Sequence, residues 1–458
     1  MTGDRESAAS VPRMTESGRA IDREVATHAA AAIGLSDDLR AHPELGYAET
    51  YAADRSAAWL RERDLEPRTG LAGTGLKVVV DSGRPGPTVA LLGELDAVHL
   101  PSHPRAASNG AAPACGHHAS LAAACAATAA VATLLATSAD MSGRLALVLV
   151  PAEEMLPPAR LADLRAAGVA VRATGKTELL RLGELDDVDL ALMVHTGREG
   201  GPRFSVGDTL RGAVAISGRF LGSAAHGGSS PELGVDAVKA ARRALDALES
   251  PTVRADAGIA ANLRQPEAAL GSVPAECGVD VLARHETLDG LRDVASRIDH
   301  ALNAAARSVG ARLERSAELA YAPTRSASSL DDVVAACAAE VVGPDGHARG
   351  RAIGASSDIG DLGLVMPVSH PYSSGATGHH HSATYEVDDT ERAIVEPARY
   401  LARAVTALLA DDAAAARRVL AETPTMSRQE YEALRASYQH VRTEWPDLPA
   451  RPQEGAPT

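Results

Sequence analysis

The chain has 458 residues, a length that predicts two or three domains. Hydrophobic residues make up 45% and charged residues 23% of the sequence, which excludes a disordered chain and is typical of a globular protein. The formal net charge is −15. Binding to a phosphate backbone needs clustered Lys and Arg, so this acidic balance argues against a nucleic-acid partner.

Cysteine usage and the N-terminal residues bear on the compartment. Cys115, Cys125, Cys277 and Cys337 form no closely spaced pair, which in a long chain is typical of a reducing compartment. The N-terminal residues contain no apolar run of the kind that a signal peptide has. We therefore expect a cytoplasmic protein.

One apolar stretch, residues 119–141, is long enough to cross a bilayer and carries a single charge, Asp140. It consists mostly of Ala, Thr and Ser, with few of the Leu, Ile and Phe residues that favour insertion. The sequence therefore predicts a buried helix here and no membrane partner.

Helices and strands alternate in the first part of the chain. The patterns predict helices over residues 21–40, 49–63 and 119–137. They predict strands over residues 75–80, 88–92, 145–150 and 188–194. This alternation predicts an α/β fold with a mostly buried sheet.

The pattern changes after about residue 208. Strands are predicted over residues 213–220, 279–284 and 314–320, and amphipathic helices over residues 235–248 and 288–308. The succession is typical of a small β-α-β-β-α-β sandwich inserted into the first domain. We assign residues 18–208 and 322–410 to a discontinuous first domain. Residues 209–321 form the inserted domain. Residues 411–458 form a helical C-terminal extension with a flexible end.

Cys115, Gly116 and His117 form the first candidate site. A Cys and a His separated by one residue can reach one metal ion if the chain turns sharply, which glycine permits. Thiolate and imidazole suit zinc, and the positive end of the following helix would favour a thiolate. The alternative is a helix entry loop in which neither side chain has a chemical role.

Other candidates lie at strand ends and late in the chain. Glu153 and Glu154 follow strand 145–150, where α/β proteins place ligands, although a solvated acidic loop is the alternative. His195 ends strand 188–194, and His379–His381 form a tract; either could supply metal ligands or lie in an ordinary loop. Cys, His and Glu side chains on successive loops at one edge of a sheet together predict a two-metal site.

The order of the motifs resembles the M20 metallopeptidase family, within its amidohydrolase branch of aminobenzoyl-glutamate hydrolases and related dipeptidases. The resemblance covers about residues 20–410. Its matching segments follow the family's order: His42–Gly46, Glu94–Val98, Cys115–His118, Pro151–Glu154, Asp189–His195, His226 with Asp236–Ala237, Ser356–Asp361, His370–Tyr372 and His381–Ser382.

The resemblance implies a metallo-aminopeptidase-like α/β/α catalytic domain and an inserted α+β, ferredoxin-like lid that also forms a homodimer. It implies two divalent ions, with zinc expected and manganese as the alternative. Their ligands would be Cys115, His117, Glu154, His195 and His381, with Cys115 between the two ions.

The same resemblance assigns three other roles. Glu153 would be the general base, and Asp96 would orient a metal ligand. His226 would reach the active site of the partner in a dimer and stabilise the oxyanion, although its sequence context also fits a turn.

The implied activity is hydrolysis of the amide C–N bond of an N-acyl amino acid, an aminoacyl-type compound or a dipeptide-like small molecule by a metal-activated water. Three places depart from the family's pattern: His118, Ala260, and the segment Ser382–Tyr385, which lacks the acidic residue that related dipeptidases carry after the final His. These departures leave the substrate open and keep hydrolytic deamination of an aromatic amine as an alternative. A catalytically idle ligand-binding relative and a structural metal site are further alternatives. Candidate partners for a substrate carboxylate are Arg211, Arg264 and Arg325.

Overall fold

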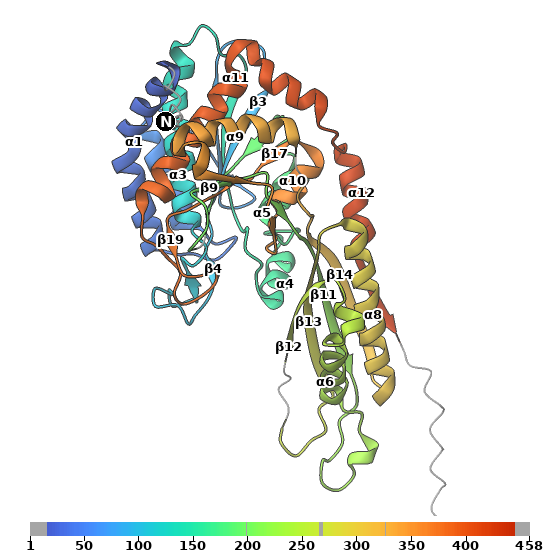
Figure 1. The fold of residues 1–458 in the computed structure, drawn as a ribbon. Coiled ribbons are helices and arrows are strands. Elements are labelled where there is room, and N and C mark those ends of the chain that lie inside the picture. Colours follow the sequence, from blue (N-terminus) through green and yellow to red (C-terminus); the bar gives the residue numbers. More distant parts are fainter. Residues whose placement is uncertain (1–15, 198, 265–268, 326, 445–458) are drawn as a thin grey trace, which may run out of the picture. The chain divides into compact units, whose positions relative to one another are not determined.

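The computed structural model describes residues 16–197, 199–264, 269–325 and 327–444 (Figure 1). The described chain divides into two compact units. Unit 1 comprises the chain up to Thr209, together with Arg325–Ile353 and Asp361–Thr425. Unit 2 comprises Leu210–Thr324, Gly354–Gly360 and the chain from Met426.

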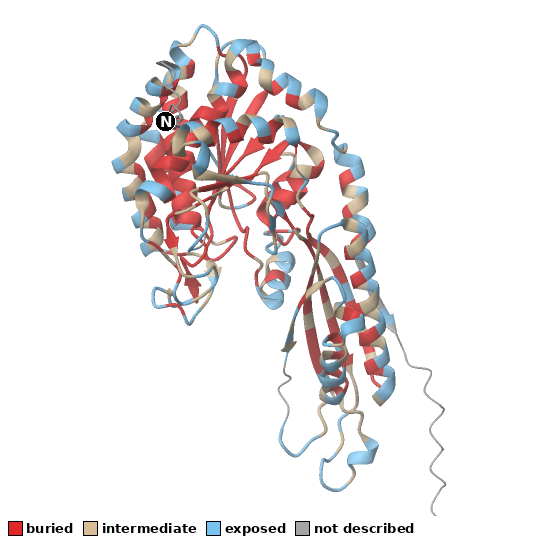
Figure 2. Cartoon of the chain, viewed as in Figure 1, coloured by how far each residue is buried: buried red, intermediate tan, exposed pale blue. Residues whose placement is uncertain are grey.

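Unit 1 is built on a six-stranded sheet in the order β1-β2-β6-β3-β7-β17. β6, β3, β7 and β17 run parallel, whereas β2 is antiparallel to both of its neighbours. Every residue of β3 is buried (Figure 2), as expected for a strand in a sheet covered on both faces. The strands are β1 Arg68–Leu71, β2 Gly75–Asp81, β3 Thr88–Glu94, β6 Arg144–Val150, β7 Leu190–Leu192 and β17 Val368–Ser369.

The helix α3, His117–Thr137, packs against the sheet and against α1, Glu16–Ala41, and α11, Glu396–Glu422. Among the described residues it is the one helix long and apolar enough to cross a membrane, and most of it is buried inside the protein. A Cβ on Gly93 of β3 would lie 3.1 Å from the Cα of Leu121, so the helix approaches the sheet closely. The predicted buried helix is confirmed.

The remaining elements of unit 1 are shorter. Its other helices include α2 Thr50–Arg61, α4 Pro158–Ala166, α5 Gly175–Leu182 and α9 Ser328–Val342. A small sheet in the order β15-β9-β18-β8 is formed by His347–Arg349, Phe204–Val206, Tyr372–Ser373 and His195–Thr196. Two strand pairs, β4 with β5 and β19 with β20, are formed by Val98–His99, Ala111–Ala112, Ala376–Thr377 and Glu386–Val387.

The candidate residues of unit 1 gather at one edge of its sheet. β3, β6 and β7 are parallel, so their carboxyl ends meet at the same edge. Asp96 follows β3, Glu153 and Glu154 follow β6, and His195 follows β7. Ala152 has a positive φ of 47°, a conformation uncommon for a residue with a Cβ. The backbone therefore turns sharply just before the paired glutamates.

Unit 2 is a five-stranded antiparallel sheet in the order β12-β13-β11-β14-β21. Its helices α6 and α8 pack against each other and against the sheet (Figure 1). The bounds are β11 Gly212–Leu221, α6 Ala237–Leu248, β12 Gly258–Arg264, β13 Glu276–His285, α8 Leu288–Val309 and β14 Arg312–Tyr321. β12, which the sequence patterns did not reveal, completes the predicted β-α-β-β-α-β order.

The C-terminal segment differs from the separate extension expected from residue 411. α11 continues to Glu422, past an interruption at residues 410–413, and stays within unit 1. α12, Arg428–Tyr438, and β21, His440–Glu444, belong to unit 2, where β21 pairs with β14. The buried Arg435 donates a hydrogen bond to the carbonyl of Leu319, which anchors α12. The flexible end expected within residues 411–458 falls on residues 445–458, which lie outside the described residues.

Gly175 allows α5 to begin against the loop that carries the paired glutamates. A Cβ at this position would lie 1.7 Å from the carbonyl oxygen of Pro151. We expect Gly175→Ala to destabilise the protein by about 1–3 kcal/mol, because the loop or the helix must shift. Thermal unfolding measures this change. Gly34→Ala is the control: its Cβ would meet nothing within 4 Å in the interior of α1, so stability should be unchanged or higher.

Candidate metal centre

Gly116 sets the turn that brings Cys115 and His117 together. Its φ of 90° is left-handed, and α3 begins at the next residue. A Cβ on Gly116 would lie 2.5 Å from the Tyr385 hydroxyl oxygen and 2.8 Å from the Cβ of Thr196. Only glycine fits this position without displacement. The sequence placed the helix start two residues later, so His117 lies in the first turn rather than in the loop before it.

Five side chains expected to bind metal converge on one place. The Sγ of Cys115 lies 3.5 Å from the Nε2 of His195 and 3.4 Å from the Nε2 of His381. The Nε2 of His381 is 2.8 Å from Oε1 of Glu154. Cys115 belongs to two ligand groups, one with His117 and His195 and one with Glu154 and His381, each with its ligand atoms within 4.8 Å of one another. Cys115 is therefore the residue that these two groups share.

Asp96 holds two of these residues in place. Its Oδ2 accepts a hydrogen bond from the backbone N–H of Glu154 at 2.9 Å. The Nδ1 of His117 lies 3.0 Å from the carbonyl oxygen of Asp96 and 3.2 Å from its Oδ1. A carbonyl oxygen only accepts, so Nδ1 of His117 donates and a neutral ring keeps its lone pair on Nε2. Asp96 therefore fixes the tautomer that can bind a metal through Nε2.

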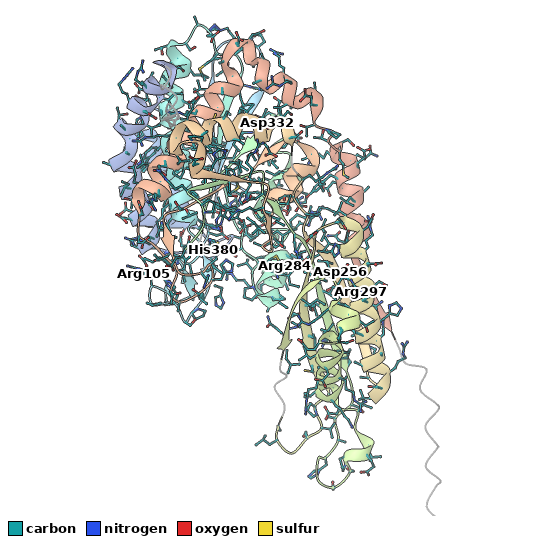
Figure 3. All side chains as sticks on the ribbon, viewed as in Figure 1. Arg105, Asp256, Arg284, Arg297, Asp332 and His380 are labelled. Carbon is teal, nitrogen blue, oxygen red and sulfur yellow. The ribbon has the colours of Figure 1, made fainter. Side chains whose placement is uncertain are left out.

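His195 is oriented in the same way. Its Nδ1 lies 2.9 Å from the carbonyl oxygen of Thr196, which leaves Nε2 for Cys115 and for a metal. In the tract His379–His381, the Nε2 of His380 (Figure 3) lies 2.9 Å from that same carbonyl, and its ring stacks on Tyr385 at 5.0 Å. His380 thus supports the loop, while His381 joins the ligand groups.

The ionisation of this cluster favours a bound cation. Burial alone would lower the pKa of His381, but the Glu154 carboxylate and Cys115 outweigh it and raise the pKa to about 11. Burial would likewise lower the pKa of His117, yet Glu94 and Cys115 raise it well above its usual value. The acidic groups thus attract positive charge to both imidazoles. A divalent ion can supply that charge in place of the protons.

Glu94 and Lys176 are part of the site although sequence reasoning gave neither a role. Glu94, the last residue of β3, is buried, and its Oε1 accepts a hydrogen bond from Nζ of Lys176 at 2.5 Å. Its Oε2 lies 3.2 Å from Nε2 of His117, and Oε2 of Glu153 lies 3.9 Å from the same nitrogen. Glu94, His117 and Glu153 form a third ligand group. Glu94 stands in a quoted motif, whereas no local pattern marked Lys176.

The sequence also gave no indication that Glu49 supports the site. Its carboxylate accepts hydrogen bonds from the backbone N–H of Ala152 and from the Thr74 hydroxyl, both at 2.7 Å. Burial, followed by the nearby Asp96, raises the pKa of Glu49 to about 7. Glu49 therefore holds the loop before the paired glutamates, at a position 103 residues away along the chain.

A second layer of aromatic rings borders His195. The ring centroids of His370 and Tyr372 lie 5.8 Å and 5.2 Å from that of His195. His370 is buried, and neither ring nitrogen has a hydrogen-bond partner. Burial lowers its pKa to about 4, so the ring is neutral at ordinary pH. Sequence reasoning used His370 and Tyr372 only as a family motif.

His118 and His226 lie outside the described ligand groups. The Nδ1 of His118 is 2.8 Å from the Ser36 hydroxyl, and burial lowers the pKa of His118 to about 3. It therefore has a neutral ring that packs against α1. His226 is exposed in unit 2, where its Nδ1 accepts hydrogen bonds from the backbone N–H groups of Gly228 and Ser229 at 3.1 and 3.0 Å. Its expected role at a partner's site stays a prediction.

Two of the arginines considered for a substrate carboxylate have partners of their own. Arg211 pairs with Glu286 at 3.1 Å, and Arg264 pairs with Asp280 at 2.7 Å. Arg325 is exposed and belongs to unit 1. Their expected role in binding a substrate carboxylate stays a prediction.

Comparisons with known proteins give the same family that the motifs suggested. Indole-3-acetyl-aspartic acid hydrolase from Enterobacter agglomerans is 29% identical over 346 residues, covering 70% of this chain and 74% of that protein. One of the p-aminobenzoyl-glutamate hydrolase subunits from Escherichia coli (strain K12) is 26% identical over 347 residues, again covering 70% of this chain and 74% of the relative. A solved dinuclear metal binding peptidase of family M20 from Bacillus subtilis shares the fold, with a TM-score of 0.62, 18% identity and coverage of 84% of this chain and 99% of that chain.

Ligand groups at the carboxyl edge of a largely parallel sheet, with a buried carboxylate beside them, define the class of metallohydrolases. The chain matches peptidase family M20/M25/M40 over residues 90–407 and belongs to that family. It is therefore a hydrolase that acts on amide C–N bonds.

Asp96 provides a test of the positioning contacts. Asp96→Asn keeps the side-chain size but replaces one of the two acceptor oxygens by an amide donor, so the side chain can no longer accept from both His117 and Glu154. We expect the affinity for divalent ions to fall about 10–100-fold, as measured by competition with a chelator. Asp189→Asn is the control, since Oδ2 of Asp189 accepts from the Thr88 N–H at the opposite end of β3. Unchanged affinity in Asp96→Asn would show that Asp96 does not position the ligands.

Proposed function

We propose that this protein uses two divalent metal ions to hydrolyse the amide bond of an N-acyl amino acid or a dipeptide-like small molecule. The observation that carries the proposal is the sharing of Cys115 between two ligand groups. The proposed ligands are Cys115, His117, Glu154, His195 and His381. Thiolate, imidazole and carboxylate together suit zinc, with manganese as the alternative.

The charges of the site support two cations. As whole residues, Cys115, Glu94, Asp96, Glu153 and Glu154 are all less than one-tenth exposed. Like charges gathered in the interior are costly unless they are compensated. Lys176 supplies one fixed positive charge, in its pair with Glu94. Two divalent ions would balance the rest once the Cys115 thiol is ionised.

We propose Glu153 as the general base. The sharp turn at Ala152 sends the two adjacent glutamates different ways: Glu154 meets His381, and Glu153 approaches His117. Bound ions would polarise the amide carbonyl and make a water molecule more acidic. Glu153 would accept the proton of the attacking water and pass it to the leaving nitrogen. Since the His381 side chain is 48% exposed, substrate can approach from that side.

The relatives favour amide substrates that carry a free carboxylate. Indole-3-acetyl-aspartic acid and p-aminobenzoyl-glutamate are both amides whose nitrogen belongs to an acidic amino acid. When water attacks such an amide carbonyl, Glu153 would again accept the proton of the water and pass it to the leaving nitrogen. This chemistry favours amide hydrolysis over deamination of an aromatic amine, and the complete set of ligands and base disfavours an idle relative.

We further propose a cytoplasmic homodimer. The four cysteines are buried and unpaired, which fits a reducing compartment. The exposed ring of His226 on unit 2 leaves Nε2 available for a second copy of the chain. In such a dimer His226 would donate a hydrogen bond to the oxyanion formed in the partner's site.

Glu153→Gln tests the proposed chemistry. Wild-type protein should bind about two ions per chain and cleave members of a panel of N-acyl amino acids, dipeptides, p-aminobenzoyl-glutamate and indole-3-acetyl-aspartate in the presence of Zn²⁺ or Mn²⁺. Glu153→Gln should keep the ions and lower kcat by about 10²–10⁴-fold, because the base is lost. Glu184→Gln, which removes a carboxylate paired with Arg68, is the control. A wild-type protein that takes up neither ion would refute the proposal.

Mixing two inactive variants tests the shared site. His226→Ala lacks the proposed oxyanion donor, and Glu153→Gln lacks the base. If His226 serves the partner's site, a mixed dimer contains one site with both groups intact, so exchange of protomers should restore part of the activity. Size-exclusion chromatography and kinetics of the mixture measure this. A mixture that exchanges protomers and stays inactive would place His226 outside the reaction.

A further inference from the structure

We infer that Glu94 is a sixth metal ligand and that Lys176 holds its carboxylate in the binding position. This inference rests on the proposed two-metal function, and it adds a residue to which the motifs gave no role. In it, Oε2 of Glu94 binds the ion that His117 binds, while Oε1 stays with the Lys176 ammonium.

The first argument is the contact between Glu94 and His117. Oε2 of Glu94 lies 3.2 Å from Nε2 of His117, and both atoms are buried without a hydrogen-bond partner. Buried polar atoms in folded proteins almost always have a partner, so this pair points to a proton or a cation that both atoms hold. The ligand atoms of Glu94, His117 and Glu153 all lie within 4.8 Å of one another, which is close enough for one ion.

The second argument is the position of the imidazole proton. The Nδ1 of His117 donates to the carbonyl oxygen of Asp96 at 3.0 Å, so Nε2 is the ring nitrogen that faces Oε2 of Glu94. Without a metal, a proton on Nε2 makes the two groups an ion pair. A divalent ion bound to both atoms would take the place of that proton. Two ligands at the usual zinc distances in a tetrahedral site are about 3.3 Å apart, close to the separation found here.

The third argument is the burial of Lys176. Both Lys176 and Glu94 have no exposed side-chain surface, and their Nζ–Oε1 distance is 2.5 Å. Because the Lys176 ammonium binds one oxygen of the Glu94 carboxylate, the other oxygen is left to bind an ion. Carboxylates that bind metals are commonly held in place by such a hydrogen bond to their second oxygen. Lys176 follows Gly175, which packs against Pro151 at the start of the Glu153 loop. The start of α5 therefore contacts the loop that carries Glu153 and also supplies the residue that holds Glu94.

Glu94→Gln is the direct test. The amide keeps the shape of the side chain but is a weaker ligand, so one of the two ions should bind at least about 10-fold more weakly while the other is little affected. Chelator competition measures both affinities. Visible absorption of the Co²⁺-loaded protein reports the ligand number, which a purely structural ion pair would not change. Glu94→Asp, which retains a carboxylate, should recover part of the affinity, and it carries the test if Glu94→Gln does not fold.

Lys176→Met tests the positioning role against a matched control. Losing the ammonium should weaken the same ion and change the Co²⁺ absorption, because the Glu94 carboxylate is then no longer held. Lys77→Met removes another buried lysine, on β2, where Nζ pairs with Asp187 outside the ligand groups. We expect Lys77→Met to lower stability while leaving both ion affinities and the spectrum unchanged. Equal effects of the two lysine variants on ion binding would overturn the role of Lys176.

The outcomes separate this inference from the proposed function. If the wild-type protein binds two ions and Glu94→Gln keeps both affinities and the spectrum, Glu94 is not a ligand and the two-metal function stands. If the wild-type protein binds no ion, both proposals are wrong. Loss of one ion's affinity with a changed spectrum in Glu94→Gln supports the sixth ligand.

Discussion

The Asp96 carboxylate is the contact on which the site depends, because it joins three segments that would otherwise be independent. It follows β3, accepts a hydrogen bond from the loop after β6, and orients a ring in the first turn of α3. Parallel strands bring these segments to one edge of the sheet, but parallel pairing alone does not fix side chains. The hydrogen bonds of Asp96 fix the positions of His117 and Glu154 at this edge. Glu49 holds the neighbouring turn at Ala152.

This geometry is maintained against a considerable electrostatic cost. Acidic groups collected in the interior repel one another, and burial makes the repulsion stronger than it would be in water. Positive charge offsets this cost. The buried Lys176 supplies one charge, and the raised pKa values of His117 and His381 favour their positively charged forms. In the proposed function, bound cations supply the positive charge in place of those protons. The features that make the site costly for the folded chain are the ones that would make it selective for divalent ions.

The sequence predicted the parts of this protein that local patterns encode. Alternating apolar runs revealed the buried strands and α3, and the ordered motifs named the five converging side chains and Asp96. Lys176 was missed because its contact with Glu94 spans 82 residues and no local pattern marks a lysine whose partner is so distant. β12 was missed because its exposed, mixed residues lack the apolar alternation of its neighbours. The C-terminal segment was taken as an extension because pairing of β21 with β14 depends on contacts remote in the chain.

β21 has a consequence for how copies of this chain could associate. An unpaired strand edge can recruit another chain, and pairing with β21 covers one edge of the unit 2 sheet. Within the described residues, β12 has a strand neighbour on one side only. If two copies paired through β12, each would use its remaining edge and growth would stop at two molecules. A sheet with both edges open could continue to add copies into a fibre. By covering one edge of the sheet, β21 would thus prevent edge-to-edge association from continuing beyond a dimer.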